Sequence, residues 1–333
     1  GLHDLGSGGY AWLQPDGGWG WSNAGLVVDG GESFLIDTLF DVPLTREMLD
    51  AMKKAEPKAA AKIGTVVNTH HNGDHCNGNE CCKGAEIIAH KLAVEGMRHE
   101  PPALLAGFLD MAPQMGDLGK YVTQCFGPFD FKGVTQTLPT TTFETELTRH
   151  VGAKEIRIMH VGPAHTPGDA LVYVPADRTV FTGDILFIEG HPIMWEGPVG
   201  NWIDACDKII AMDVETVVPG HGPITGKNGV QAVRERDRGR GGAVPFVLAA
   251  GVEVDFRFAA HHCHRLGARR THADQFCADG FRHRDRFGSG ARAADDHARR
   301  FRRCGHLDRR IGAQDHVETG QRDRADFGLA VHA

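Results

Sequence analysis

A chain of 333 residues, of which 41% are hydrophobic, is long enough for one large domain or two smaller ones with a substantial core. It has no window close to the roughly 18 uninterrupted apolar residues of a membrane span and no basic-then-apolar leader, so we expect a cytoplasmic protein without membrane contact. The net charge is −7, and the eight cysteines have no paired spacing, which favours reduced thiols over a disulfide framework.

The first 60 residues are typical of the start of an α/β domain. Short apolar segments bounded by turn residues predict strands at residues 10–13, 26–28 and 33–37. A helix is expected at residues 45–55, with Thr45 as its N-cap. The Pro/Gly-rich loop before the second strand carries Trp19, with Trp21 just beyond it. Such tryptophans either pack locally or form a flap over a ligand.

An apolar run at residues 63–67 has the β-branched character of a buried strand. It leads into a polar turn at residues 69–75, where three histidines, an aspartate and a glycine fall within six residues. Imidazole and carboxylate groups that converge at a strand end are the ligands of a borderline divalent cation such as zinc. Gly73 allows the tight turn that such convergence needs. The alternative is a polar strand-to-helix turn with Asn72 or Asp74 as a helix cap.

Helices and short strands are expected to continue after this turn. The expected helices and strands are at residues 78–84, 85–89, 91–99, 141–143, 147–151 and 155–160. Residues 100–135 are rich in Pro, Gly, Met and Phe without a clear period. We interpret them as an insertion that serves either a pocket or a subunit contact, the latter in a homodimer.

Three later turns repeat the pattern of an apolar strand that ends at a Gly-flanked His or Asp. The polar residues at these turns are His165, Asp184 and His221. In open α/β architectures, ligands bind where strand ends meet loops. A lone His beside Gly is usually a turn residue, but three such turns together with the first cluster favour a shared metal site.

The four turns, in this order, resemble the motifs of the metallo-β-lactamase-fold hydrolases. That family has Thr-His-x-His-x-Asp-His, then Gly-x-x-His-Thr-x-Gly, Thr-Gly-Asp and Gly-His-Gly. The matching segments here are residues 69–75, 162–168, 182–184 and 220–222, and Asp37 matches an Asp after an early strand of the family. The resemblance covers residues 10–225. It implies an α/β fold, a four-layer αββα sandwich with metals at one edge of the sheets.

Carried over by position, the resemblance implies two metal sites joined by one bridging carboxylate. His70 and His165 would bind the first metal, Asp184 would bridge, and the second metal would be held by Asp74, His75 and His221. The departure is Asn72, which stands where the family has its second His, and an amide oxygen is a poorer zinc ligand than imidazole. The first site should therefore be weaker, differently coordinated or empty. One or two Zn²⁺ ions are expected, with Fe or Mn as alternatives.

Two further histidines near the motifs are substitutes to consider for the missing ligand. They are His71 and His160, of which His71 is expected to point away from the site.

The implied chemistry is hydrolysis. A divalent metal lowers the pKa of a bound water from about 15.7 to about 7. Asp74 is placed in the motif to orient the resulting hydroxide, and His191 is a candidate proton donor for the leaving group. No Ser-His-Asp or Cys-His arrangement is evident, so no covalent enzyme intermediate is expected.

Four tryptophans are candidates for an apolar substrate rim, although each is more often a core residue in such a domain: Trp19, Trp21, Trp195 and Trp202. A small ester, lactone, thioester or β-lactam suits such a rim. Hydrolytic dehalogenation of a chloroaromatic is an alternative on the same metal site. The alternative of another class is a non-catalytic metal- or ligand-binding module, in which Asn72 marks lost activity.

The composition changes towards the C-terminus. Residues 1–225 carry 29 acidic against 15 basic side chains, whereas residues 226–333 carry 14 against 21. We therefore assign residues 1–228 to a hydrolase domain and residues 229–333 to an Arg/His/Ala/Gly-rich extension. This extension is a basic arm for nucleic acid, a poorly ordered tail, or an out-of-frame reading of a GC-rich gene. The acidic body makes nucleic acid a poor candidate partner and a small molecule a better one.

Overall fold

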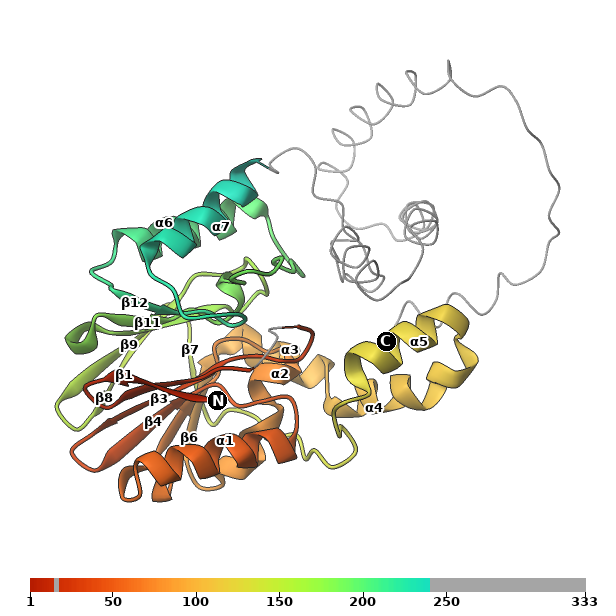
Figure 1. The fold of residues 1–333 in the computed structure, drawn as a ribbon, viewed down its shortest axis with the longest axis horizontal. Coiled ribbons are helices and arrows are strands. Elements are labelled where there is room, and N and C mark those ends of the chain that lie inside the picture. The colour runs from red at the N-terminus through yellow and green to blue at the C-terminus, as the bar shows by residue number, and fades with distance from the viewer. Residues whose placement is uncertain (15–17, 240–333) are drawn as a thin grey trace, which may run out of the picture. The chain divides into compact units, whose positions relative to one another are not determined.

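The computed structural model describes residues 1–14 and 18–239 of the chain. Two β-sheets pack face to face, and helices cover both outer surfaces (Figure 1). This is the four-layer αββα sandwich that the sequence predicts, so the predicted fold class is confirmed. Among the described residues, no helix is long and apolar enough to cross a membrane.

The first sheet has seven strands, in chain order across the sheet. They are β1 (Leu2–Gly6), β2 (Gly9–Trp12), β3 (Ala24–Asp29), β4 (Glu32–Ile36), β5 (Thr65–Val67), β6 (Glu86–His90) and β7 (Thr141–Phe143). The pairs from β1 to β4 are antiparallel, and the pairs from β4 to β7 are parallel.

The second sheet has five strands in the order β12-β11-β10-β9-β8. They are β8 (Glu146–Val151), β9 (Lys154–His160), β10 (Ala170–Val174), β11 (Thr179–Phe181) and β12 (Thr216–Val218). Only the β11–β12 pair is parallel. The predicted strands of both sheets are confirmed, with shifts of a few residues at their ends.

Seven α-helices accompany the sheets within the described residues. They are α1 (Val42–Ala55), α2 (Gly73–Cys76), α3 (Lys91–His99), α4 (Pro102–Met111), α5 (Gly116–Phe126), α6 (Val199–Ala211) and α7 (Lys227–Gly239). α1 lies on the seven-stranded sheet, and α6 and α7 lie on the five-stranded sheet (Figure 1). The predicted domain boundary at residue 228 falls inside α7, whose Val230 and Val233 are buried. The rest of the predicted extension, from residue 240, lies outside the described residues.

Alternation along the strands explains why the sandwich has three apolar layers. On β3, Val27 points into the core between the sheets, whereas Leu26 and Val28 pack towards α1. On β4, Phe34 faces the inter-sheet core and Leu35 faces α1. Successive side chains of a strand point to opposite faces, so a strand apolar at every position is buried on both. Each such side chain contributes about 1.5–3 kcal/mol by burial.

One expectation about helices is wrong. α1 begins earlier than expected, with Asp41 as its N-cap, because the Asp41 carboxylate accepts a hydrogen bond from the Leu44 N–H at 2.9 Å. The Thr45 hydroxyl instead donates to the Asp41 carbonyl at 2.8 Å and accepts from the Leu39 N–H at 3.1 Å. A hydroxyl within the first turn therefore looked like a cap.

The insertion at residues 100–135 is largely helical, because it contains α4 and α5. Leu105 and Leu109 of α4 pack against the aromatic cluster around Phe129, whereas Leu104 and Met111 are 41% and 40% exposed. Because α4 has apolar residues on both its packed and its exposed face, its sequence lacks the periodicity by which an amphipathic helix is normally recognised.

Two stacked histidines join the two sheets near α3. The rings of His90 and His160 are parallel within 1°, with centroids 3.8 Å apart. The His90 Nε2–H donates to the Glu144 carbonyl at 2.8 Å, and its Nδ1 accepts from the Leu92 N–H at 3.3 Å, which caps α3. Burial, and secondarily His160, lowers the pKa of His90. His160 is thus part of this stack and not one of the clustered metal-ligand candidates.

The stack predicts a specific acid sensitivity. A pKa that is lowered in the folded protein means that the contribution of neutral His90 is present above about pH 6.5 and is lost as the pH falls below that value. We expect a change from pH 7.5 to pH 5.5 to lower the free energy of unfolding of the metal-free protein more, or raise it less, than that of His90→Asn, which keeps an N-cap acceptor but cannot titrate. The raised pKa values of His75 and His221 act in the opposite sense in both proteins and cancel in this comparison. Urea titrations at the two pH values measure the difference, and the same change in both proteins would contradict the assignment.

Candidate metal centre

Six of the predicted ligands converge where the ends of strands from both sheets meet. His70, Asp74 and His75 follow β5, His165 follows β9, Asp184 follows β11 and His221 follows β12. They form two groups whose ligand atoms lie within 4.8 Å of one another, and all six residues are buried. The first group is His70, His165 and Asp184, and the second group is Asp74, His75 and His221.

The Asp184 carboxylate lies at the centre of the two groups. Its Oδ1 is 3.0 Å from Nε2 of His75, and its Oδ2 is 3.3 Å and 3.4 Å from Nε2 of His165 and His221. Nε2 of His70 is 3.8 Å from the same Oδ2. Burial raises the pKa of Asp184, but the four imidazoles outweigh it and hold the pKa well below its usual range. An ionised carboxylate between both groups fits the bridging role that the sequence predicts for it.

Hydrogen bonds on Nδ1 fix three of the four imidazole rings that face Asp184. The carboxylate of Asp37 lies 2.9 Å from Nδ1 of His75. Nδ1 of His165 donates to the Ile193 carbonyl at 2.6 Å, and Nδ1 of His70 is 3.0 Å from the hydroxyl of Thr69. A partner on Nδ1 sets the ring orientation and directs the Nε2 lone pair towards the centre, as in protein metal sites.

The residues fit a divalent metal. Nε2 of His70 is buried and has no hydrogen-bond partner in the described part of the chain. Buried polar atoms normally have a partner, so this nitrogen needs one that the protein does not supply. Imidazole nitrogens and carboxylate oxygens are the donor set of zinc and similar borderline cations.

The sequence model described as the metallo-β-lactamase superfamily matches residues 17–221. The chain belongs to the metallo-β-lactamase superfamily. The matched segment includes all six residues of the two ligand groups.

Individual relatives are distant. A linear primary-alkylsulfatase of a Pseudomonas species is 24% identical over 236 residues, which cover 64% of this chain and 42% of that protein. A hydroxyacylglutathione hydrolase of Methylococcus capsulatus is 25% identical over 160 residues, 47% of each protein. The chain thus spans about half the length of these relatives. The structure of a metallo-β-lactamase from Pontibacter korlensis aligns with a TM-score of 0.53 and 17% identity, over 72% of this chain and 98% of that one, which supports the fold.

Asn72, where we predict a departure from the superfamily motif, lies beside the first group. Its Oδ1 lies 2.7 Å from Nε2 of His165. Because Nδ1 of His165 faces the Ile193 carbonyl, Nε2 is the ring nitrogen left to bind a metal, and the Asn72 amide is its hydrogen-bond partner here. The side chain at position 72 therefore engages the nitrogen through which His165 would act as a ligand.

Glycines let the turns pack against Asp184. A Cβ on Gly220 would lie 2.0 Å from Oδ1 of Asp184, and a Cβ on Gly183 would lie 2.5 Å from the Thr69 hydroxyl. Gly183 also has a φ of +50°, which disfavours residues with a side chain. Gly220 is thus required by the close approach of its backbone to a ligand, and Gly183 by its left-handed backbone and its contact with Thr69.

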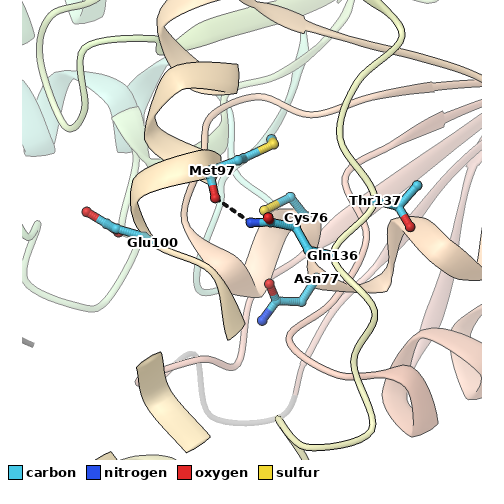
Figure 2. A pocket seen from close by; sticks show the side chains of 6 residues that line it. All are labelled: Cys76, Asn77, Met97, Glu100, Gln136 and Thr137. Carbon is cyan, nitrogen blue, oxygen red and sulfur yellow. Dashed lines mark hydrogen bonds between the residues drawn. The ribbon is translucent and has the colours of Figure 1, made fainter. Parts of the chain in front are cut away.

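The back of the first turn is closed by α3 and a buried thiol. As expected, His71 points away, with its Nε2 3.6 Å from a Glu100 carboxylate oxygen. The Cys76 thiol donates to the carbonyls of His71 and Asn72, both at 3.3 Å, and burial raises its pKa well above its usual range. Figure 2 shows the small pocket beside this thiol, lined by Cys76, Asn77, Met97, Glu100, Gln136 and Thr137. None of the six ligands lines it.

Three of the four predicted rim tryptophans lie near the first group, and two of them, Trp195 and Trp19, are not fully buried. The ring of Trp195 is 6.4 Å from that of His165, and Trp19 is 6.1 Å from Trp195 and 5.9 Å from Phe126 of α5. Both tryptophans are half-buried. Phe126 was not predicted, because nothing in the insertion marks which side of it faces the site.

The other two rim candidates are not surface residues of the site. Trp21 packs against Phe129 at 4.8 Å in the aromatic cluster beside α4. The ring of Trp202 is 5.9 Å from that of His165, but Trp202 is fully buried and its indole N–H donates to the Ile185 carbonyl at 2.8 Å, so it packs behind this ligand and does not form a rim. His191 is half-buried in the loop before Ile193 and belongs to neither ligand group.

Restoring the missing ligand should strengthen the first group. We expect Asn72→His to raise Zn²⁺ affinity at that group by about tenfold or more, because imidazole replaces an amide that engages His165. Competition titration with a chromophoric chelator measures the affinity, and elemental analysis gives the stoichiometry. His99→Asn, an exchange at an exposed histidine at the end of α3, is the control. Unchanged affinity in Asn72→His would contradict the position assigned to residue 72.

Metal binding should release protons. Burial lowers the pKa of His221, but Asp184 and Asp74 outweigh it and raise the pKa to about 9. The same carboxylates, with Asp37, raise the pKa of His75 well above its usual range against burial. Because ligation requires neutral imidazole, we expect close to two protons released per Zn²⁺ in the second group at pH 7, and fewer above pH 9. Calorimetry in buffers of different ionisation enthalpy measures this release. Binding without proton release would contradict it.

Proposed function

We propose that this protein is a zinc-dependent hydrolase of small organic esters, a class in which we include lactones and thioesters. Membership of the superfamily supports a metal-dependent hydrolase. The observation that carries the proposal is the buried Asp184 carboxylate between four imidazole Nε2 atoms at 3.0–3.8 Å. Such a site has no evident structural use, because it leaves a buried nitrogen of His70 without a partner in the described residues.

The residues of the site would have two roles, which are metal binding and proton transfer. His70, His165 and Asp184 would hold one ion, and Asp74, His75, His221 and Asp184 the other. When bound, zinc supplies a Lewis acid and lowers the pKa of water to about 7. The side chain of Asp74 is 12% exposed, against 4% for Asp184. We assign to Asp74 the orientation and deprotonation of the attacking water, and to His191 the protonation of the leaving group.

The substrate class rests on the rim and on the relatives. Trp195 and Trp19 place aromatic surface beside His165, which favours an apolar group next to the scissile bond. The relatives are an alkylsulfatase and a hydroxyacylglutathione hydrolase, so ester-type bonds head the list. β-Lactams and chloroaromatics, which the motif resemblance also suggests, belong in the same substrate panel.

Metal removal tests the proposal. We expect exhaustive chelation to abolish turnover of an ester, lactone and thioester panel, and added Zn²⁺ to restore it. His75→Ala should lose more than about 100-fold in kcat/KM, because even the outer-shell partners of metal ligands are worth 10–100-fold. His99→Ala is the matched control. Turnover that survives verified metal loss would contradict the mechanism. Metal binding without turnover of any panel member would favour the non-catalytic alternative.

A further inference from the structure

The end of the β2–β3 loop contacts the turn that carries His221. Asn23 donates to three carbonyls of that turn: its side-chain NH₂ to Pro219 at 3.0 Å and Gly222 at 2.8 Å, and its backbone N–H to Gly220 at 2.7 Å. Its Oδ1 accepts from the Gln14 N–H at 3.3 Å. A single buried amide therefore fixes the backbone on both sides of His221.

The neighbouring residue contacts the other half of the second group. The hydroxyl of Ser22, which is fully buried, donates to the carbonyl of Asp74. Asp74 and His221 are themselves 3.3 Å apart, between Oδ2 and Nε2. Ser22 and Asn23 thus join two ligand turns, one from each sheet, at the point where the ligands meet.

His221 needs such support more than the other imidazoles do. His70, His75 and His165 each have a partner on Nδ1, whereas Nδ1 of His221 is buried without a hydrogen-bond partner in the described residues. Its ring is held by stacking on Phe187, with centroids 4.9 Å apart and planes within 2°. Stacking leaves the ring free to slide in its plane, so the position of Nε2 depends on the backbone.

We infer that Ser22 and Asn23 are positioning residues for the second metal group, in which Asn23 acts through the backbone as the missing outer-shell partner of His221. The inference rests on the proposed function only in taking the second group as a metal site. The first group is oriented by Ile193 and Thr69 instead. Loss of Asn23 should therefore weaken one group and spare the other.

Two parent proteins separate the groups. His165→Ala dismantles the first group and leaves the second to bind Zn²⁺. His221→Ala combined with Asn72→His dismantles the second and strengthens the first. Zn²⁺ affinity is measured by chelator competition in each parent with and without Asn23→Ala. We expect Asn23→Ala to lower affinity by about 10–100-fold in the first parent and to leave the second parent unchanged.

A second pair of variants, with smaller changes to the side chain, tests the inference if Asn23→Ala does not fold. Ser22→Ala should lower affinity in the His165→Ala parent in the same direction. Ser33→Ala is its matched control, because Ser33 is a buried serine on β4 that donates to the Lys62 carbonyl, away from the site. Equal losses in both parents, no loss with Asn23→Ala or Ser22→Ala, or an equal loss with Ser33→Ala would overturn the inference alone. No Zn²⁺ binding in either parent would overturn the proposed function as well.

Discussion

The Asp184 carboxylate, buried and ionised among four imidazoles, is the interaction on which the site depends. A carboxylate taken out of water is costly unless opposite charges and hydrogen bonds surround it. Here the compensation comes from His70, His75, His165 and His221, which lie on three different turns of the sandwich. No single element can supply it. The two sheets must pack together before Asp184 is stabilised, so the electrostatics of the site depend on the packing of the sandwich.

A second buried carboxylate, Asp37, connects the strands to this centre. It accepts from the N–H and the hydroxyl of Thr69 at 2.7 Å and 2.8 Å and contacts Nδ1 of His75. Its backbone φ of +61° is a conformation that costs about 1–3 kcal/mol for a residue with a side chain, although Asp tolerates it better than most. Three good hydrogen bonds offset that strain. The carbonyl of His75 is meanwhile held by Asn68 at 2.9 Å.

Much of this site could be predicted from the sequence, because its ligands are the residue types that metals require and stand at the ends of apolar strands. The residues that hydrogen-bond to the ligand turns from behind could not be predicted. Ser22 and Asn23 look like ordinary polar residues before a buried strand, and their partners are about 50 and 200 positions away. The burial of Trp202 beside His165 was missed for a related reason, since an indole N–H that finds a carbonyl inside the core leaves no mark on the sequence. α4 was missed because its apolar residues have no period.

The two ligand groups differ before any metal binds. His75 has a carboxylate partner on Nδ1, which raises ligand basicity, whereas His165 has a backbone carbonyl and His70 a hydroxyl. Asp74 brings a further carboxylate to the second group, while the first group has the amide of Asn72. Charge and basicity therefore favour a cation in the second group. The Nδ1 partners already make the two groups unequal, and Asn72 increases that difference. The aromatic surface of Trp195 lies beside His165, in the group that lacks this further carboxylate.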